Sequence, residues 1–202
     1  MSSARLCLVR HGETAWNAER RVQGQLDLPL SELGHAQARS LCDALPEGRF
    51  TALYASDLTR VRQTAAPAAA RLGLAPRIEP GLRERHYGSF QSLTFAEAKA
   101  ALPEDYARYM ARDPEFDFGS GESLRAFSAR AIACLETIAR RHAGEEVLVF
   151  THGGVLEMAY RRAMRMDLRA PRDFTTPNAA LNWIEAGEHW EVLGWAECEH
   201  LA

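Results

Sequence analysis

L-C-L-V-R-H-G-E-T, residues Leu6 to Thr14, indicates the fold, because a run of four apolar residues ends abruptly in an arginine, a histidine and a glycine. Four apolar residues bounded by Arg10 are typical of a buried strand, so Arg10 and His11 are expected at its carboxyl end. In open α/β sheets this is the edge where ligands bind. Imidazole is a competent nucleophile toward phosphorus, and a guanidinium can fork onto two phosphoryl oxygens, so the pair suits phosphate transfer.

A second cation follows a second predicted strand. Residues 51–56 are expected to form this strand, and a helix from Asp57 to Leu72 should follow, with Asp57 as its N-cap and Gly73 as its C-terminal signal. Arg60 then lies in the first turn after a strand end, as His11 lies just beyond the first strand. Two cations delivered by two strand ends can converge on one crevice.

The most apolar strand repeats this pattern late in the chain. Residues 146–150 are predicted to form it, and it ends in T-H-G-G, so His152 and Gly153 are placed at a further strand end before a helix at 155–164. Two histidines and two arginines are therefore expected along one edge of a single sheet.

The alternation of strands and helices favours an α/β fold, a three-layer α/β/α sandwich with a mostly parallel sheet. The last two strands are separated only by a short turn and should pair, so at least one antiparallel strand is expected. We expect a single domain over residues 1–202, with a small helical cap inserted at about 90–118. The other predicted elements are helices at 31–45, 94–112 (broken at Pro103) and 123–142, and strands at 76–79, 180–185 and 190–195.

Composition excludes several classes of protein. With 202 residues, 47% hydrophobic and 25% charged, the chain resembles an ordinary globular protein, and its net charge of −3 offers no footprint for nucleic acid or anionic lipid. The start, M-S-S-A-R, lacks a signal-peptide core, and no apolar run is long enough to span a membrane, so a cytoplasmic location is expected. The four cysteines are scattered and indicate neither a zinc module nor a disulfide framework. Oligomeric state is left open.

Six motifs follow one another along nearly the whole chain: L-V-R-H-G-E-T-x-x-N, Q-G-x-x-D-x-P-L-S-x-x-G-x-x-Q-A, S-D-L-x-R-x-x-Q-T-A, L-R-E-R-x-Y-G, G-E-S and T-H-G-G. Together they resemble the histidine phosphatase superfamily, also called phosphoglycerate mutase-like. The resemblance implies that His11 becomes phosphorylated and that Glu84 donates a proton. It implies that the phosphoryl oxygens are bound by Arg10, Arg60 and His152. It also implies phosphate or substrate contacts at the positions that match the remaining motif residues: Thr14, Asn17, Gln23, Gly24, Tyr87 and Gly153.

Elementary chemistry supports these roles. Two guanidiniums, an imidazole and backbone amides can stabilise a transferring phosphoryl group, so neither a metal ion nor another cofactor is expected. A neutral His11 presents a lone pair only if its other ring nitrogen donates to an acceptor, such as the carbonyl of Gly12. A carboxyl such as Glu84 can act first as acid and then as base. Zinc held by His11 and His152 is disfavoured, because no Asp or Cys arrives at useful spacing and arginines would repel the cation.

Three functions fit the pattern. The leading prediction is a phosphomonoesterase that acts on a small-molecule phosphate ester. The alternative is a cofactor-dependent phosphoglycerate mutase, because E-R-H-Y-G looks like the mutase version of this loop. Phe95, however, stands where mutases resembling this chain carry a substrate-binding lysine, and the predicted cap is shorter than theirs. The third is a phosphate-binding member without turnover, least favoured because every expected catalytic position is filled. The sequence names no physiological substrate.

Overall fold

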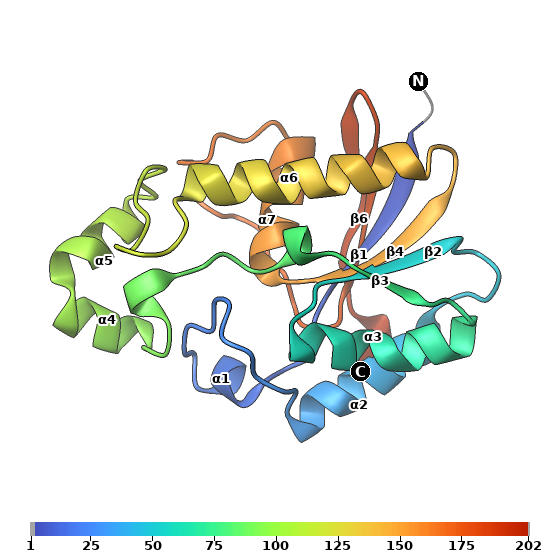
Figure 1. Cartoon of the computed structure of the whole chain (residues 1–202), viewed down its shortest axis with the longest axis horizontal. Helices are drawn as coiled ribbons and strands as arrows, with labels where there is room; N and C mark the ends of the chain where they lie inside the picture. The colour runs from blue at the N-terminus through green and yellow to red at the C-terminus, as the bar shows by residue number, and fades with distance from the viewer. Residues whose placement is uncertain (1–2, 202) are drawn as a thin grey trace.

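The computed structural model describes residues 3–201, which form a six-stranded sheet in the order β3-β2-β4-β1-β5-β6 (Figure 1). Its strands are β1 (Ala4–Arg10), β2 (Ala52–Ala55), β3 (Pro76–Ile78), β4 (Glu146–Thr151), β5 (Leu181–Ala186) and β6 (Trp190–Glu197). The four strands from β3 to β1 are parallel, whereas β5 runs antiparallel to both of its neighbours. The predicted α/β class and the mostly parallel sheet with an antiparallel component are therefore confirmed.

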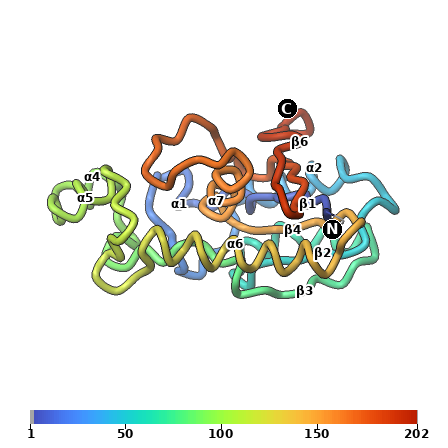
Figure 2. Tube along the Cα trace, turned by 90° about the horizontal axis from the view of Figure 1, so that it is seen from above, coloured from blue at the N-terminus to red at the C-terminus, as the bar shows by residue number. Residues whose placement is uncertain are grey.

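Helices cover both faces of the sheet (Figures 1 and 2). The helices are α1 (Ala15–Ala18), α2 (Glu32–Ala44), α3 (Thr59–Leu72), α4 (Phe95–Ala101), α5 (Pro103–Met110), α6 (Leu124–Arg141) and α7 (Gly153–Ala163). Alternating side chains of β1 point to opposite layers, as expected for an extended strand. Leu6 and Leu8 pack in the core with α6 and α7, and Cys7 and Val9 in the core with α2 and α3. No helix in residues 3–201 is both long and apolar enough to cross a membrane.

The register of the parallel strands brings the predicted site residues together. Arg10 and Thr151, the last residues of β1 and β4, are direct partners, and the N–H of His11 donates to the carbonyl of Thr151 at 3.0 Å. Strand β2 borders β4 on its other side, so the start of α3 reaches the same edge. His11, His152 and Arg60 thus follow three adjacent strand ends.

The segment predicted as a cap forms α4 and α5, which project beyond one end of the sheet (Figures 1 and 2). It packs around its own small aromatic core, which includes Phe90, Phe116 and Phe118. Backbone hydrogen bonds join its base to the loop after β1: the N–H of Val22 donates to Leu93 O, and the N–H of Ser92 donates to Val22 O, each at 2.9 Å.

Two local predictions were wrong. The helix after β2 begins at Thr59, not at Asp57, because the Asp57 carboxylate instead forms an ion pair with Arg83. The cap comes from a distant residue, since Asp27 accepts from the N–H of Thr59 at 2.7 Å and from its hydroxyl at 2.8 Å. The loop expected after β1 also contains the short helix α1, whose N-cap is Thr14.

Candidate active site

His11 is buried and neutral, with one ring nitrogen left free. Its side chain is buried, and Nδ1 lies 2.7 Å from the carbonyl oxygen of Gly12. Because a carbonyl only accepts, Nδ1 must carry the hydrogen, and Nε2 keeps its lone pair. Burial, followed by the charges of Arg60 and Arg10, lowers the pKa of His11 well below 6.5, so the ring is uncharged at neutral pH. The predicted contact with Gly12 is confirmed.

His152 stands beside His11, with the two ring centroids 5.3 Å apart. It has no exposed surface, and its Nε2 lies 3.0 Å from the hydroxyl oxygen of Ser56. Arg60 donates through Nη2 toward its Nδ1 at 3.3 Å. Burial and the neighbouring Arg60 lower the pKa of His152 well below 6.5, so both imidazoles are neutral.

The two arginines are anchored by backbone carbonyls. Arg60 has no exposed surface and donates to Gly24 O and Leu26 O, each at 2.8 Å, while burial lowers its pKa to about 10. Arg10 donates through Nη1 to Thr176 O at 2.8 Å, and burial lowers its pKa as well. Two desolvated guanidiniums beside two neutral imidazoles concentrate positive charge at the strand ends.

Three buried side-chain nitrogen or oxygen atoms in residues 3–201 have no hydrogen-bond partner, and all belong to predicted site residues: Arg10 Nε, Arg60 Nε and Gln23 Oε1. A buried donor without a partner destabilises the folded protein by about 1–3 kcal/mol. A bound ligand that accepts from these groups would remove that cost. Two cationic N–H donors suit an oxyanion, and the Gln23 carbonyl suits a hydroxyl donor.

Glu84 reaches the same cleft on the loop between β3 and α4. Its Oε1 accepts from the N–H of Arg85 at 2.8 Å, and its Oε2 accepts from the N–H of Gly154 at 3.0 Å. Arg130, on α6, stabilises this loop by donating to three of its backbone carbonyls, those of Gly81, Arg83 and Glu84. The carboxyl is therefore held at a defined place in the cleft that His11 also lines.

The cleft has a volume of about 200 Å³ and is lined by most of the predicted residues: Arg10, His11, Asn17, Gln23, Gly24, Arg60, Glu84 and Tyr87, together with Trp16, Arg20, Arg21, Val22 and Phe95. Burial raises the pKa of Tyr87 well above 10, so its hydroxyl is protonated. Gly24 has φ +55°, a conformation that favours glycine, and its carbonyl is the one that holds Arg60.

Thr14, His152 and Gly153 do not line the cleft, and both ring nitrogens of His152 are already engaged by Ser56 and Arg60. The hydroxyl of Thr14 accepts from the N–H of Asn17 at 3.2 Å, and the Asn17 side chain accepts from the N–H of Thr14 at 3.1 Å, which is a capping box. A Cβ on Gly153 would lie 3.3 Å from Arg10 Nε, so this glycine gives the arginine room.

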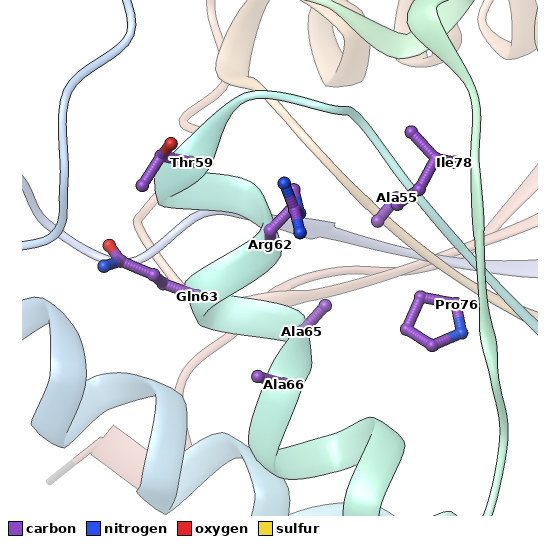
Figure 3. A pocket seen from close by; sticks show the side chains of 8 residues that line it. All are labelled: Ala55, Thr59, Arg62, Gln63, Ala65, Ala66, Pro76 and Ile78. Atoms are coloured by element: carbon purple, nitrogen blue, oxygen red, sulfur yellow. The ribbon is translucent and has the colours of Figure 1, made fainter.

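A larger hollow of about 580 Å³ lies elsewhere, in the groove between α3 and the edge strand β3 (Figure 3). Its lining is mainly small and apolar, and it includes Arg62 but none of the predicted site residues. The larger volume therefore does not mark the candidate active site. The smaller cleft is the candidate because the predicted histidine, arginines and glutamate line it.

Several residues that position the site were missed from the sequence. Thr176 holds Arg10 and is itself contacted by Arg172 at 2.6 Å. Asn178 donates to the carbonyl of His11 at 2.7 Å. The hydroxyl of Thr64 accepts from the N–H of Gly12 at 2.9 Å. Of these, only Thr64 lay within a recognised motif, S-D-L-x-R-x-x-Q-T-A. In the part of the chain that the structure describes, no three His, Cys, Asp or Glu side chains gather closely enough to hold a metal ion.

The fold is an α/β/α sandwich that gathers neutral histidines and desolvated arginines at adjacent strand ends. This arrangement is typical of a site that binds an oxyanion. The chain belongs to the histidine phosphatase superfamily, branch 1, whose family model matches residues 6–197. It is 38% identical over 201 residues to "Metal-independent phosphoserine phosphatase" of Arabidopsis thaliana, covering 98% of this chain and 83% of that protein. It is 37% identical over 201 residues to "Phosphoglycerate mutase-like protein 4" of the same plant, covering 98% and 87%.

Solved structures agree with this family. Bacillus stearothermophilus YhfR has a TM-score of 0.89 and 29% identity, with 98% of this chain and 100% of that chain covered. A mycobacterial glucosyl-3-phosphoglycerate phosphatase has a TM-score of 0.83 and 30% identity, with 96% and 99% covered. The relatives thus include phosphatases as well as proteins named as mutases or mutase-like, including probable phosphoglycerate mutases GpmB from Yersinia.

Proposed function

We propose that the protein is a metal-independent phosphomonoesterase that hydrolyses small phosphorylated metabolites through a phosphohistidine on His11. The observation that carries this proposal is the neutral His11, with Nε2 free, between two arginines whose buried Nε atoms lack partners. A phosphoryl group bound there satisfies both donors while its phosphorus faces a nucleophile.

In the first step, the Nε2 lone pair of His11 attacks phosphorus and the bond to the ester oxygen breaks. The leaving oxygen takes a proton from Glu84 and departs as an alcohol. In the second step, a water molecule attacks phosphorus, the phosphorus–nitrogen bond breaks, and its electron pair returns to Nε2. The proton of that water goes to Glu84, which is ready for another cycle. Ester and water become alcohol and inorganic phosphate.

Arg10 and Arg60 stabilise the charge that spreads over the equatorial oxygens in both steps. Their backbone anchors at Thr176, Gly24 and Leu26 keep the guanidiniums in place before the substrate arrives, so little reorganisation is needed during the reaction. His152 adds a polar ring at the side of the nucleophile.

Hydrolysis is favoured over mutase activity by the state of the cap. Its two arginines are already engaged: Arg108 donates to Asp113 at 2.7 and 2.9 Å, and Arg112 pairs with the partly buried Glu157. At the mouth of the cleft, Phe95 offers a ring, 40% exposed, rather than a cation. Neither of these cap arginines is therefore free to hold a bisphosphorylated intermediate, which favours discharge of the phosphohistidine by water, although Arg20 and Arg21 also line the cleft.

A hydrolysis panel tests the proposal. The purified protein is assayed for phosphate release from phosphoserine, sugar phosphates, nucleoside monophosphates and 3-phosphoglycerate, the last with and without 2,3-bisphosphoglycerate. We expect His11-dependent hydrolysis of at least one monoester and little conversion of 3- to 2-phosphoglycerate. Mutase turnover faster than hydrolysis would reverse the assignment.

A further inference from the structure

We propose that Gly154, the second glycine of T-H-G-G, is the positioning residue for Glu84. It holds the carboxyl by its backbone N–H and leaves room for it by having no side chain. This inference rests on the proposed role of Glu84 as proton donor and acceptor.

The first support is the hydrogen bonding of the carboxyl. Gly154 lies in the first turn of α7, where backbone N–H groups have no partner within the helix, and its N–H is satisfied by Glu84 Oε2 at 3.0 Å. The N–H of Arg85 satisfies Oε1 at 2.8 Å. Two donors from two segments of chain fix the plane of the carboxyl, which a single bond would leave free to rotate.

This arrangement is compatible with proton transfer. Each carboxyl oxygen has two lone pairs, and one lone pair on each oxygen accepts a hydrogen bond from a backbone N–H. The other lone pair on each oxygen stays available to carry the proton for the leaving group or to accept it from water. The two backbone donors therefore orient the acid without occupying the position that reacts.

The second support is steric. A Cβ on residue 154 would lie 2.1 Å from Glu84 Oε1 and 3.0 Å from the Cζ of Phe127. Phe127 is buried in the core between the sheet and α6, so it cannot retreat easily. The carboxyl group of Glu84 has to move instead, and it is displaced from the position in which the two backbone N–H groups hold it.

The neighbouring glycine provides a matched control. A Cβ on Gly153 would lie 3.3 Å from Arg10 Nε and from Thr176 Oγ1, and no atom of Glu84 is among its nearest contacts. Gly153→Ala is therefore expected to disturb phosphate binding, whereas Gly154→Ala is expected to disturb the acid. The same chemical change at adjacent positions thus tests two different parts of the site.

The kinetic experiment compares two esters. Phosphoserine has a poor alkyl leaving group that needs a proton, whereas p-nitrophenyl phosphate hardly needs one. For Gly154→Ala we expect kcat/KM on phosphoserine, or on the best alkyl ester of the panel, to fall about a hundredfold more than on p-nitrophenyl phosphate. For Gly153→Ala we expect similar losses on both esters. Equal losses in Gly154→Ala would overturn the proposal.

A double mutant separates this role from a general structural one. Once Glu84→Gln has removed the acid, Gly154→Ala should cost less than about threefold further on the alkyl ester, because both changes act through the same carboxyl. Fully additive losses would contradict the inference. If neither ester shows His11-dependent hydrolysis in the wild type, the proposed function has failed, which is seen before any variant is compared.

Nuclear magnetic resonance tests the contact without substrate and without the Gly154 variant. The amide proton of Gly154 should resonate downfield in the wild type, because it donates to a carboxyl oxygen, and should move upfield in Glu84→Ala. The Gly144 amide, on the turn before β4, provides the internal reference and should stay in place. A Gly154 resonance unchanged by loss of the carboxyl would overturn the proposal even if Gly154→Ala did not fold.

Discussion

Replacing Arg60 by methionine should remove most of the stabilisation that inorganic phosphate gives to the folded protein. The wild-type guanidinium is fully buried, with its pKa lowered to about 10, and its Nε has no partner. Methionine fills similar space without the charge. Because methionine also leaves the carbonyls of Gly24 and Leu26 without their donor, we expect the phosphate-free variant to have a lower Tm, and we expect it to lose most of its affinity for inorganic phosphate.

The magnitude follows from the unpaired donors. Arg10 Nε and Arg60 Nε can each give phosphate one charge-assisted hydrogen bond, worth about 1.5–3 kcal/mol. Two such bonds correspond to a dissociation constant between about millimolar and tens of micromolar. At phosphate concentrations about a hundredfold above that constant, the wild type gains about 2.7 kcal/mol. For a chain of this size that raises Tm by about 5–10 °C. Losing one bond weakens binding by about tenfold to a hundredfold.

The assay is thermal unfolding over a phosphate titration, at constant ionic strength, for the wild type, Arg60→Met and Arg62→Met. Arg62 is the control, because it is an exposed arginine on the same helix that faces the groove in Figure 3 rather than the cleft. Arg62→Met should keep the wild-type phosphate shift. If Arg60→Met retains the wild-type dissociation constant within about threefold, the unpaired guanidinium donor is not the phosphate ligand.

Four further outcomes are expected. His11→Ala should lower turnover more than about a thousandfold, and a substantial residual rate in a contaminant-free preparation would contradict the nucleophile assignment. Glu84→Gln should slow alkyl esters far more than p-nitrophenyl phosphate, and equal slowing would remove Glu84 from the acid role. Activity should survive excess EDTA, and a loss that zinc or magnesium restores would reveal a metal mechanism. Since the pKa values of His11 and His152 are lowered, the unfolded chain takes up protons first, and stability should fall below about pH 6.5 by up to about 1.4 kcal/mol per pH unit for each histidine. Urea unfolding of His11→Gln should show a shallower decline than the wild type between pH 6.5 and 5.5, and parallel curves would contradict it.

The fold and the gathering of Arg10, His11 and Arg60 in one cleft were predictable because both follow from strand ends. A short apolar run that stops at Arg10 or before His152 marks the end of a buried strand, and parallel neighbours place their ends at one edge. The register that pairs Arg10 with Thr151 realises this expectation. How many residues separate a charged or imidazole side chain from the end of its strand can be read directly from the sequence.

The supports of the site were not predictable in the same way. Thr176 and Asn178 lie in the irregular stretch between α7 and β5, where no periodicity indicates which carbonyl or amide meets β1. Asp27 caps α3 from a distant segment, so a search for a cap adjacent to the helix settles on Asp57 instead. Thr14 was predicted to contact phosphate or substrate, but its hydroxyl caps the short helix α1 at Asn17, a helix that the sequence did not predict. Contacts of this kind depend on the path of the folded chain.

The join between the cap and the loop after β1 bears on how this enzyme family can change. Val22 meets Leu93 and Ser92 through backbone N–H and carbonyl groups, which every residue except proline supplies. A mutation that exchanges side chains on α4 or α5 therefore leaves these two backbone hydrogen bonds in place, whereas the ion pair between Arg21 and Glu97 of α4 depends on the side chains. We therefore expect substitutions in the cap to disturb the strand-end residues less than a joint made only of side chains would allow.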